Sequence, residues 1–227
     1  MSENSIKRIK CGNENCYIVR QDDSAVLVDT GAKKYRQRVL DAAREEDVAL
    51  VVITHGHYGH VGNAVAVADD LDIPIAMHAG DVDLIKDNQL QRMHANSLYG
   101  YLELFYVHKL HRRDVEDTFV PDIYITEGYS LEEFGIDAKV VELPGHTLGS
   151  IGLDVWGTDF VAGDAVVSRP SPGPATIYGN RMYMEDSCDK LYRLGRRHVH
   201  CGHGNPTENF NWTGAEQPLE TSIGHVG

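Results

Sequence analysis

The chain has 227 residues, of which 42% are hydrophobic, and its formal net charge at pH 7 is −13. That length suffices to bury the core of one large domain, while the acidic balance argues against a nucleic-acid partner, because phosphate binding requires a basic surface. No run of about 20 apolar residues occurs, so no membrane span is expected, and no linker or repeat divides the chain, so a single domain over residues 1–227 is predicted.

Short β-prone segments alternate with amphipathic helices along the chain, which is the order of a layered α/β domain. In the first half the predicted strands are residues 6–9, 17–20, 25–28, 50–53 and 73–77. Helices are predicted over residues 35–44, where Val39, Leu40 and Ala43 share one face, and over residues 63–71. In the second half the predicted elements are a helix at 186–194 and strands at 123–125, 138–142, 150–155, 160–162 and 198–201.

The segment between these halves, at about residues 81–121, is rich in large aromatic and aliphatic residues. The spacing of Leu98, Leu102 and Phe105 is typical of an amphipathic helix that buries one face, either in the core or in a homodimer contact. A cover over a binding cleft is the alternative. We therefore predict a helical, aromatic insertion here.

Three histidines, His55, His57 and His60, directly follow the apolar run at residues 49–53. Imidazole is the commonest metal ligand, and histidines i and i+2 at a strand end can converge on one cation while a third at i+5 points elsewhere. The pattern therefore predicts a site for one ion or for two adjacent ions. A solvent-exposed run of histidines on a loop is the alternative, which three histidines behind a buried-type strand disfavour.

Further metal-binding residue types recur in glycine-bearing turns later in the chain. They are His146 in Pro-Gly-His-Thr, Asp164 in Gly-Asp and His203 in Gly-His-Gly, and each follows an apolar or β-prone segment. Glycine at such turns lets the backbone approach an ion closely. Ligands gathered from several strand ends would form a rigid site.

This pattern resembles the metallo-β-lactamase superfamily, whose motifs are HxHxDH, a later GHT-type histidine, a GD aspartate and a terminal GHG-type histidine. The order and intervals fit nearly the whole chain, and residues 15–19 and 25–31 resemble the family's opening hairpin and its DTG turn. The resemblance implies an α/β fold, the four-layer αββα sandwich, with a metal cleft at one edge between the sheets. It also makes Asp29 the carboxylate that accepts the second N–H of a ligating imidazole, whereas the sequence alone equally allows an aspartate that caps the following helix.

The resemblance divides the metal ligands into two sets: His55, His57 and His146 for the first ion, and His60, Asp164 and His203 for the second. Gly59 stands where the family motif has an aspartate just before the third histidine. The second position therefore has fewer anionic donors and is expected to bind its ion more weakly. An aspartate introduced at position 59 is expected to raise its occupancy.

The resemblance further implies a zinc-dependent hydrolase with one or two ions, and it leaves iron or manganese open. A metal-bound hydroxide would attack an ester, thioester or lactone-type bond of a small molecule, with Asp164 orienting the water or bridging the ions. The compact size is similar to small glyoxalase II-like hydrolases, without their separate glutathione-binding helical domain. A mononuclear iron oxygenase of the same superfamily and a metal-binding protein with little turnover are the alternatives.

Several aromatic and basic residues are candidates for contact with the substrate. Tyr58 lies within the histidine motif, and Tyr178, Arg181 and Tyr183 follow the proline-rich loop at residues 168–174. Packed or surface positions are the alternative for all four. Tyr58, His200 and Cys201 are also minor candidates for additional metal donors.

Cysteine usage and the N-terminus favour a cytoplasmic location. The four cysteines form no paired C-x-x-C ligand set, and the first residues do not combine a basic segment, a long apolar run and a small-residue cleavage site. We therefore expect a cytoplasmic protein with reduced thiols, and a bridge between Cys11 and Cys16 is the minority alternative.

Overall fold

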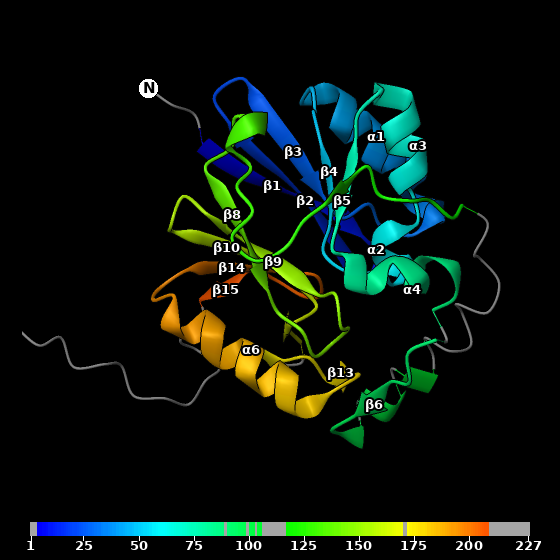
Figure 1. Ribbon diagram of the computed structural model, residues 1–227, viewed down its shortest axis with the longest axis vertical. Helices are drawn as coiled ribbons and strands as arrows, with labels where there is room; N and C mark the ends of the chain where they lie inside the picture. The colour runs from blue at the N-terminus through cyan, green and yellow to red at the C-terminus, as the bar shows by residue number, and fades with distance from the viewer. Residues whose placement is uncertain are drawn as a thin grey trace, which may run out of the picture.

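Two main β-sheets form the centre of the molecule (Figure 1). The structure is a computed structural model that describes residues 4–88, 90–98, 100–102, 104–105, 117–169 and 172–208. The six strands of the first sheet lie in the order β1-β2-β3-β4-β5-β7. They are β1 (Asn4–Cys11), β2 (Glu14–Gln21), β3 (Ser24–Val28), β4 (Val51–Ile53), β5 (Ile75–Met77) and β7 (Ile123–Tyr124). β1, β2 and β3 are antiparallel, whereas β3, β4, β5 and β7 run parallel.

The second sheet has the strand order β15-β14-β10-β9-β8. Its strands are β8 (Ala138–Glu142), β9 (Ile151–Val155), β10 (Asp159–Gly163), β14 (His198–Cys201) and β15 (Thr207–Glu208). Neighbouring strands are antiparallel except β10 and β14, which run parallel and therefore end at the same edge of the sheet. Two small ribbons complete the strands: β11 (Val166–Ser168) with β12 (Pro172–Pro174), and β6 (His94–Ala95) with β13 (Ile177–Tyr178).

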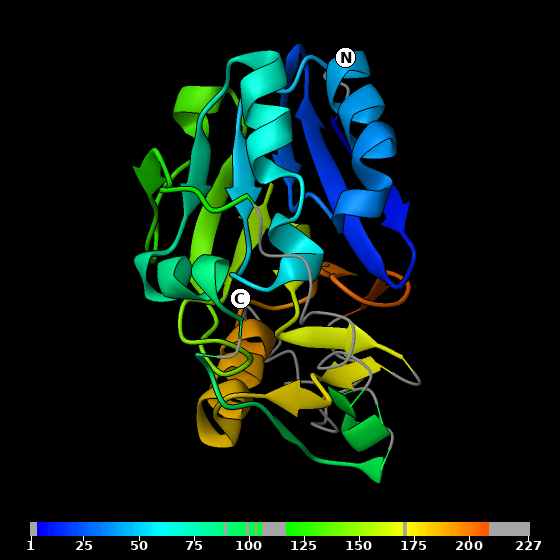
Figure 2. The same ribbon diagram turned by 90° about the vertical axis from the view of Figure 1, so that its right-hand side faces the viewer.

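Helices cover the outer faces of the two sheets. The helical segments are η1 (Lys33–Tyr35), α1 (Arg36–Glu45), α2 (Tyr58–Val61), α3 (Ala64–Leu71), η2 (Ala79–Asp81), α4 (Val82–Lys86), η4 (Glu132–Phe134) and α6 (Arg181–Arg193). In Figure 2, α1 and α3 stand in front of the first sheet, and α6 lies at the far end of the molecule, against the second sheet. The layers are therefore α, β, β, α, which confirms the sandwich predicted from the sequence.

The core follows from the alternation of side chains along the strands. In β3, Ala25 and Leu27 pack under α1 and α3, whereas Val26 and Val28 face the second sheet and join Leu153 of β9. Such a strand is buried on both faces, which is why it reads as a continuous apolar run in the sequence. The strands that precede the histidine and aspartate turns are thereby held rigidly.

Most predicted elements are confirmed, with small shifts at their ends. The helix predicted at residues 186–194 begins earlier, at Arg181, because the side chain of Asn180 accepts a hydrogen bond from the Tyr183 N–H and caps it. The helix predicted at residues 63–71 is preceded by α2, so His60 lies on a short helix rather than in a loop.

The prediction that Leu98, Leu102 and Phe105 form a face buried in the core is wrong. Leu98 is 79% exposed, Leu102 64% and Phe105 72%. The outer faces of the sheets are covered by α1 and α3 on one side and by α6 on the other, and among the described residues of the 81–121 segment only some, such as Ile85 and Phe119, pack against that core. The homodimer contact and the cleft cover stay predictions.

Two further expectations concern the membrane and the cysteines. Among the described residues, no helix combines the length and apolar character that a bilayer span requires. All four cysteines are buried free thiols, and the sulfurs of Cys11 and Cys16 lie 3.7 Å apart.

Candidate metal centre

Strand ends bring the predicted ligands together at one edge of the sandwich. His55 and His57 lie in the turn after β4, and His60 follows on α2. His146 lies between β8 and β9. Asp164 directly follows β10, and His203 follows β14, the parallel neighbour of β10.

The carboxylate of Asp164 is the common point of this arrangement. Its Oδ2 lies near the Nε2 atoms of four imidazoles, which are His203 at 3.0 Å, His60 at 3.5 Å, His146 at 3.6 Å and His55 at 3.8 Å. The fifth imidazole is that of His57, whose Nδ1 is 3.0 Å from His146 Nε2. The structure thus brings all six predicted ligand residues together.

Two groups of donor atoms have metal-site dimensions. The donor atoms of His55, His57 and His146 lie within 4.8 Å of one another, and so do those of His55, His60 and Asp164. The first group is the set predicted for the first ion. The second group shares Asp164 and His60 with the set predicted for the second ion, and His203 adjoins it through Asp164.

The far ring nitrogens of these imidazoles are held by acceptors. His60 Nδ1 lies 2.8 Å from Asp29 Oδ2, and His146 Nδ1 lies 2.9 Å from the carbonyl oxygen of Ile177. Because a carboxylate or a carbonyl only accepts, these contacts assign a proton to Nδ1 and leave Nε2 as the ring nitrogen directed at Asp164. Imidazoles fixed in this way turn Nε2 toward the place where a metal ion would bind.

The electrostatics of the centre favour a cation. Burial opposes a charge on His60, yet the carboxylates of Asp164 and Asp29 outweigh it and raise the pKa of His60 well above its usual value. Burial lowers the pKa of His55 and of His146, so these two rings stay neutral and keep their lone pairs. Burial also opposes ionisation of Asp164, but His203 and His60 hold its pKa well below the usual range.

Two buried polar atoms in the centre, His55 Nε2 and Asp164 Oδ1, have no hydrogen-bond partner among the described residues. Buried polar atoms are normally satisfied, so unpartnered atoms among converging donors call for a ligand. Imidazole nitrogens with one carboxylate are a donor set that zinc binds well, and iron also accepts it. The residues present therefore fit a metal ion.

Asp29 occupies a left-handed turn, with φ of 60°, directly after β3. Its Oδ1 accepts a hydrogen bond from the Thr54 N–H at 2.8 Å, and its Oδ2 faces His60. Neither η1 nor α1 has a side-chain cap, so the alternative that Asp29 caps the following helix is wrong. Asp29 instead joins the end of β3 to the histidine turn.

Asp81 is a buried carboxylate that the sequence reasoning missed. It accepts hydrogen bonds from the Gly56 N–H at 2.9 Å, the Gly149 N–H at 2.7 Å and the Thr147 hydroxyl at 2.5 Å. These bonds tie the turn that carries His55 and His57 to the turn that carries His146. No local pattern distinguishes this aspartate from its exposed neighbours, so only the fold reveals it.

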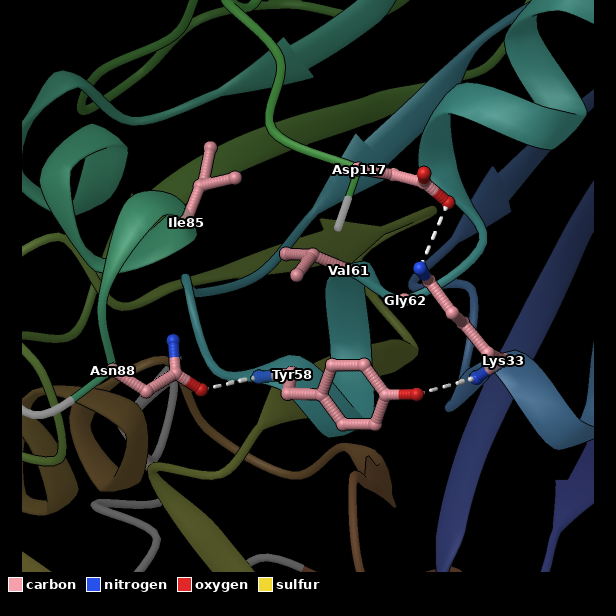
Figure 3. Close-up of a pocket in the computed structure, with 7 residues that line it drawn as sticks. All are labelled: Lys33, Tyr58, Val61, Gly62, Ile85, Asn88 and Asp117. Atoms are coloured by element: carbon pink, nitrogen blue, oxygen red, sulfur yellow. Dashed lines mark hydrogen bonds and ion pairs between the residues drawn. The ribbon is translucent and has the colours of Figure 1, made fainter. Parts of the chain in front are cut away.

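Tyr58, the first residue of α2, lines a pocket (Figure 3). Its hydroxyl accepts a hydrogen bond from the Lys33 N–H at 3.2 Å, and its own N–H donates to Asn88 Oδ1 at 2.7 Å. The lining residues are Lys33, Tyr58, Val61, Gly62, Ile85, Asn88 and Asp117. None of the six predicted ligands is among them.

The other candidate substrate contacts lie around the start of α6. The ring of Tyr178 stacks on that of His94, and Arg181 is exposed and pairs with Glu185 at 2.7 Å. Tyr183 is 43% exposed. Their contact with a substrate stays a prediction.

Neither minor donor candidate on β14 belongs to the two groups of donor atoms. His200 Nε2 lies 2.8 Å from Asp159 Oδ1, which directs it away from the centre. Burial raises the pKa of Cys201 to about 12, so this thiol stays protonated and is a poor donor.

Replacing Asp81 by asparagine is expected to lower the free energy of unfolding by about 2–4 kcal/mol. An amide keeps one acceptor oxygen but turns an N–H₂ group toward a backbone N–H that now has no acceptor. Urea denaturation measures the loss. The matched control is Asp83→Asn, an exposed carboxylate in the same segment that pairs with Lys86 and is expected to change little. Equal stability of the two variants would contradict the role given to Asp81.

Comparison with known proteins places this geometry in a family. The model of the metallo-beta-lactamase superfamily matches residues 9–186. Hydroxyacylglutathione hydrolase GloC of Haemophilus influenzae is 29% identical over 144 residues, which cover 62% of this chain and 60% of that protein, less than two thirds of its length.

Solved structures show the same fold. The B3 metallo-beta-lactamase BLEG-1 superposes with a TM-score of 0.74 at 22% identity, covering 91% of this chain and 95% of that one. TTHA1623, solved in a di-iron-bound form, gives a TM-score of 0.66 at 22% identity over the same shares of both chains. Since the family model spans most of the chain and the strand ends carry its histidine and aspartate motifs, the protein belongs to the metallo-β-lactamase superfamily.

Proposed function

We propose that the protein is a metal-dependent hydrolase that cleaves an ester, thioester or lactone-type bond of a small molecule. The observation that carries this proposal is the convergence of buried imidazole nitrogens on Asp164, with His55 Nε2 and Asp164 Oδ1 left unpartnered among the described residues. Members of the superfamily are mostly enzymes, and this donor set suits hydrolytic metals.

The six predicted ligands would hold the metal, and Asp164 would also orient the attacking water. His55, His57 and His146 would hold one ion, and His60, Asp164 and His203 a second. A bound zinc ion supplies a water molecule whose pKa is lowered to about 7 and polarises the carbonyl that is attacked. Asp164 stays ionised, because His203 and His60 lower its pKa against the effect of burial, so it can accept a hydrogen bond from that water and orient it.

A thioester is the substrate bond that the comparisons favour. GloC is named a hydroxyacylglutathione hydrolase, and it aligns with 62% of this chain. A good leaving group also suits this site, because position 59, next to His60, is a glycine and offers no carboxylate of its own to position the water.

Iron chemistry is the second candidate function. The di-iron form of TTHA1623 shows that this fold accommodates iron, and imidazole with carboxylate is also an iron donor set. A mononuclear iron oxygenase would use the same first ligand group. The metal itself separates the two proposals.

The test is to purify the protein without added metal, measure its metal content, and assay thioester, lactone and phosphoester panels. Zinc together with hydrolysis of a thioester or lactone is the expected result. Iron with oxygen consumption in the presence of a persulfide would overturn the hydrolase proposal in favour of an oxygenase. Metal without turnover on any panel would leave a binding protein.

Removal of the metal is expected to lower thermal stability as well as activity. An ion whose free concentration is about 1,000 times its dissociation constant stabilises the folded state by ~4 kcal/mol. Thermal unfolding with and without a chelator measures the shift, and added zinc is expected to reverse it. The His55→Ala variant provides the control, because its weakened site should respond much less to the chelator. Identical melting of the native protein in both buffers would show that the fold does not bind metal.

A further inference from the structure

The place of the missing motif aspartate is filled by another residue of this chain. A Cβ atom added to Gly59 would lie 3.0 Å from Cγ of Glu14, 3.4 Å from its Oε1 and 3.5 Å from its Cδ. The carboxylate of an aspartate at position 59 would be bonded to that Cβ. Glu14 therefore brings a carboxylate, from strand β2, to the space beside His60 where the family motif places one from α2.

The backbone of Glu14 is fixed against the other ligand turn of the second position. Glu14 forms an antiparallel bridge with His203. On either side of Glu14, the Asn15 N–H donates to the Gly202 carbonyl at 2.8 Å, and the Asn13 carbonyl lies 2.9 Å from His203 Nδ1. Glu14 thus lies between His203 and the helix that carries His60, both of which are predicted ligands of the second ion.

The carboxylate of Glu14 has no hydrogen bond or ion pair to any other described residue. Its side chain is partly buried. Buried carboxylates are normally paired or coordinate a metal, so a carboxylate without a partner beside the ligand turns of His60 and His203 calls for a cation.

We propose that Glu14 is the carboxylate ligand of the second metal position and replaces the aspartate that Gly59 lacks. The inference rests on the metal centre proposed above. Glu14 is not in the two groups whose donor atoms lie within 4.8 Å, so its side chain must turn about its rotatable bonds to reach the ion. Its side chain is one methylene longer than that of aspartate, which gives it the reach.

In this proposal Gly59 leaves the space that Glu14 occupies, and Glu14 supplies the carboxylate that Gly59 lacks. An added Cβ would lie only 3.0 Å from Cγ of Glu14, so a side chain at position 59 would require Glu14 to shift, and the glycine leaves room for it. The expectation of a weakened second position changes accordingly. An aspartate introduced at Gly59 alone should alter the affinity for the second ion little, because it exchanges one carboxylate for another.

Equilibrium dialysis against zinc, followed by elemental analysis, tests the inference without any assay of activity. The native protein is expected to bind two ions. The isosteric Glu14→Gln variant should bind the second ion at least ~10-fold more weakly and the first unchanged. The exposed Glu132→Gln is the matched control and should bind as the native protein does.

A double variant distinguishes loss of a ligand from a folding defect. In Glu14→Gln with Gly59→Asp, the motif carboxylate is restored and affinity for the second ion should recover, which a misfolded protein would not allow. Two ions bound with native affinity by Glu14→Gln, or a single ion bound by the native protein, would overturn the inference. A native protein that binds two ions, loses one in Glu14→Gln and hydrolyses nothing would refute the proposed hydrolase and leave the role of Glu14 standing.

Discussion

Replacing His55 by alanine is expected to lower kcat/KM for the hydrolysed substrate by at least ~10³-fold. His55 is the one residue that belongs to both groups of donor atoms found among the described residues, it is 1% exposed, and its Nε2 has no hydrogen-bond partner there. Its removal should weaken both metal positions together. Steady-state kinetics, with metal content measured on the same sample, checks both effects.

The control for this substitution is His200→Ala. His200 is also a partly buried histidine, on β14, but its Nε2 contacts Asp159, and it belongs to neither group of donor atoms. It should keep native metal content and activity. The metal centre as described would be refuted by a His55→Ala variant that retains both ions and full turnover.

The parts of the fold that the sequence predicted are those with a local signal. The strands at residues 25–28 and 50–53 lie inside the sandwich, so both of their faces are apolar, and their runs are visible without any knowledge of their neighbours. The histidine turn follows directly on such a strand. For the same reason the spacing of His55, His57 and His60 was sufficient to indicate a metal site.

The residues that could not be predicted act through contacts between distant parts of the chain. Asp81 and Thr147 are 66 residues apart in the sequence, and no local sequence pattern at either residue predicts their hydrogen bond. Glu14 reads as an ordinary strand residue until the fold places it beside Gly59. A substitution within a motif can be seen in the sequence, but the residue that compensates for it can be found only in three dimensions.

The prediction that Leu98 and Phe105 are buried was wrong for a related reason. Helical spacing of apolar residues shows that a face is apolar but not what covers it. Here α1, α3 and α6 already cover the sheets, so the same pattern that buries Val39 and Ala43 of α1 leaves Leu98 and Phe105 at the surface.

Two buried aspartates hold the histidine-bearing turns in place, and each makes a different set of contacts. Asp81 joins the turn of His55 and His57 to that of His146, whereas Asp29 joins the end of β3 to Thr54 and to His60. Each acts on ligands rather than on an ion. Asp81 therefore bears mainly on stability, and Asp29, which contacts an imidazole directly, bears on metal affinity.

Replacing Asp29 by asparagine is accordingly expected to weaken binding of the second ion about 10–100-fold. Asparagine tolerates the left-handed φ of 60° at this position, so the backbone should not change. Its amide, however, must turn an N–H₂ group toward either the Nδ1–H of His60 or the N–H of Thr54, which both need an acceptor. His60 then loses the contact that fixes its ring, while His146 keeps its contact with the Ile177 carbonyl. Titration against a chromophoric chelator resolves the two affinities.

Asp22→Asn is the matched control, since Asp22 also has a left-handed φ, of 52°, but lies exposed in a hairpin turn. Native affinity for both ions in Asp29→Asn would show that His60 does not depend on this carboxylate.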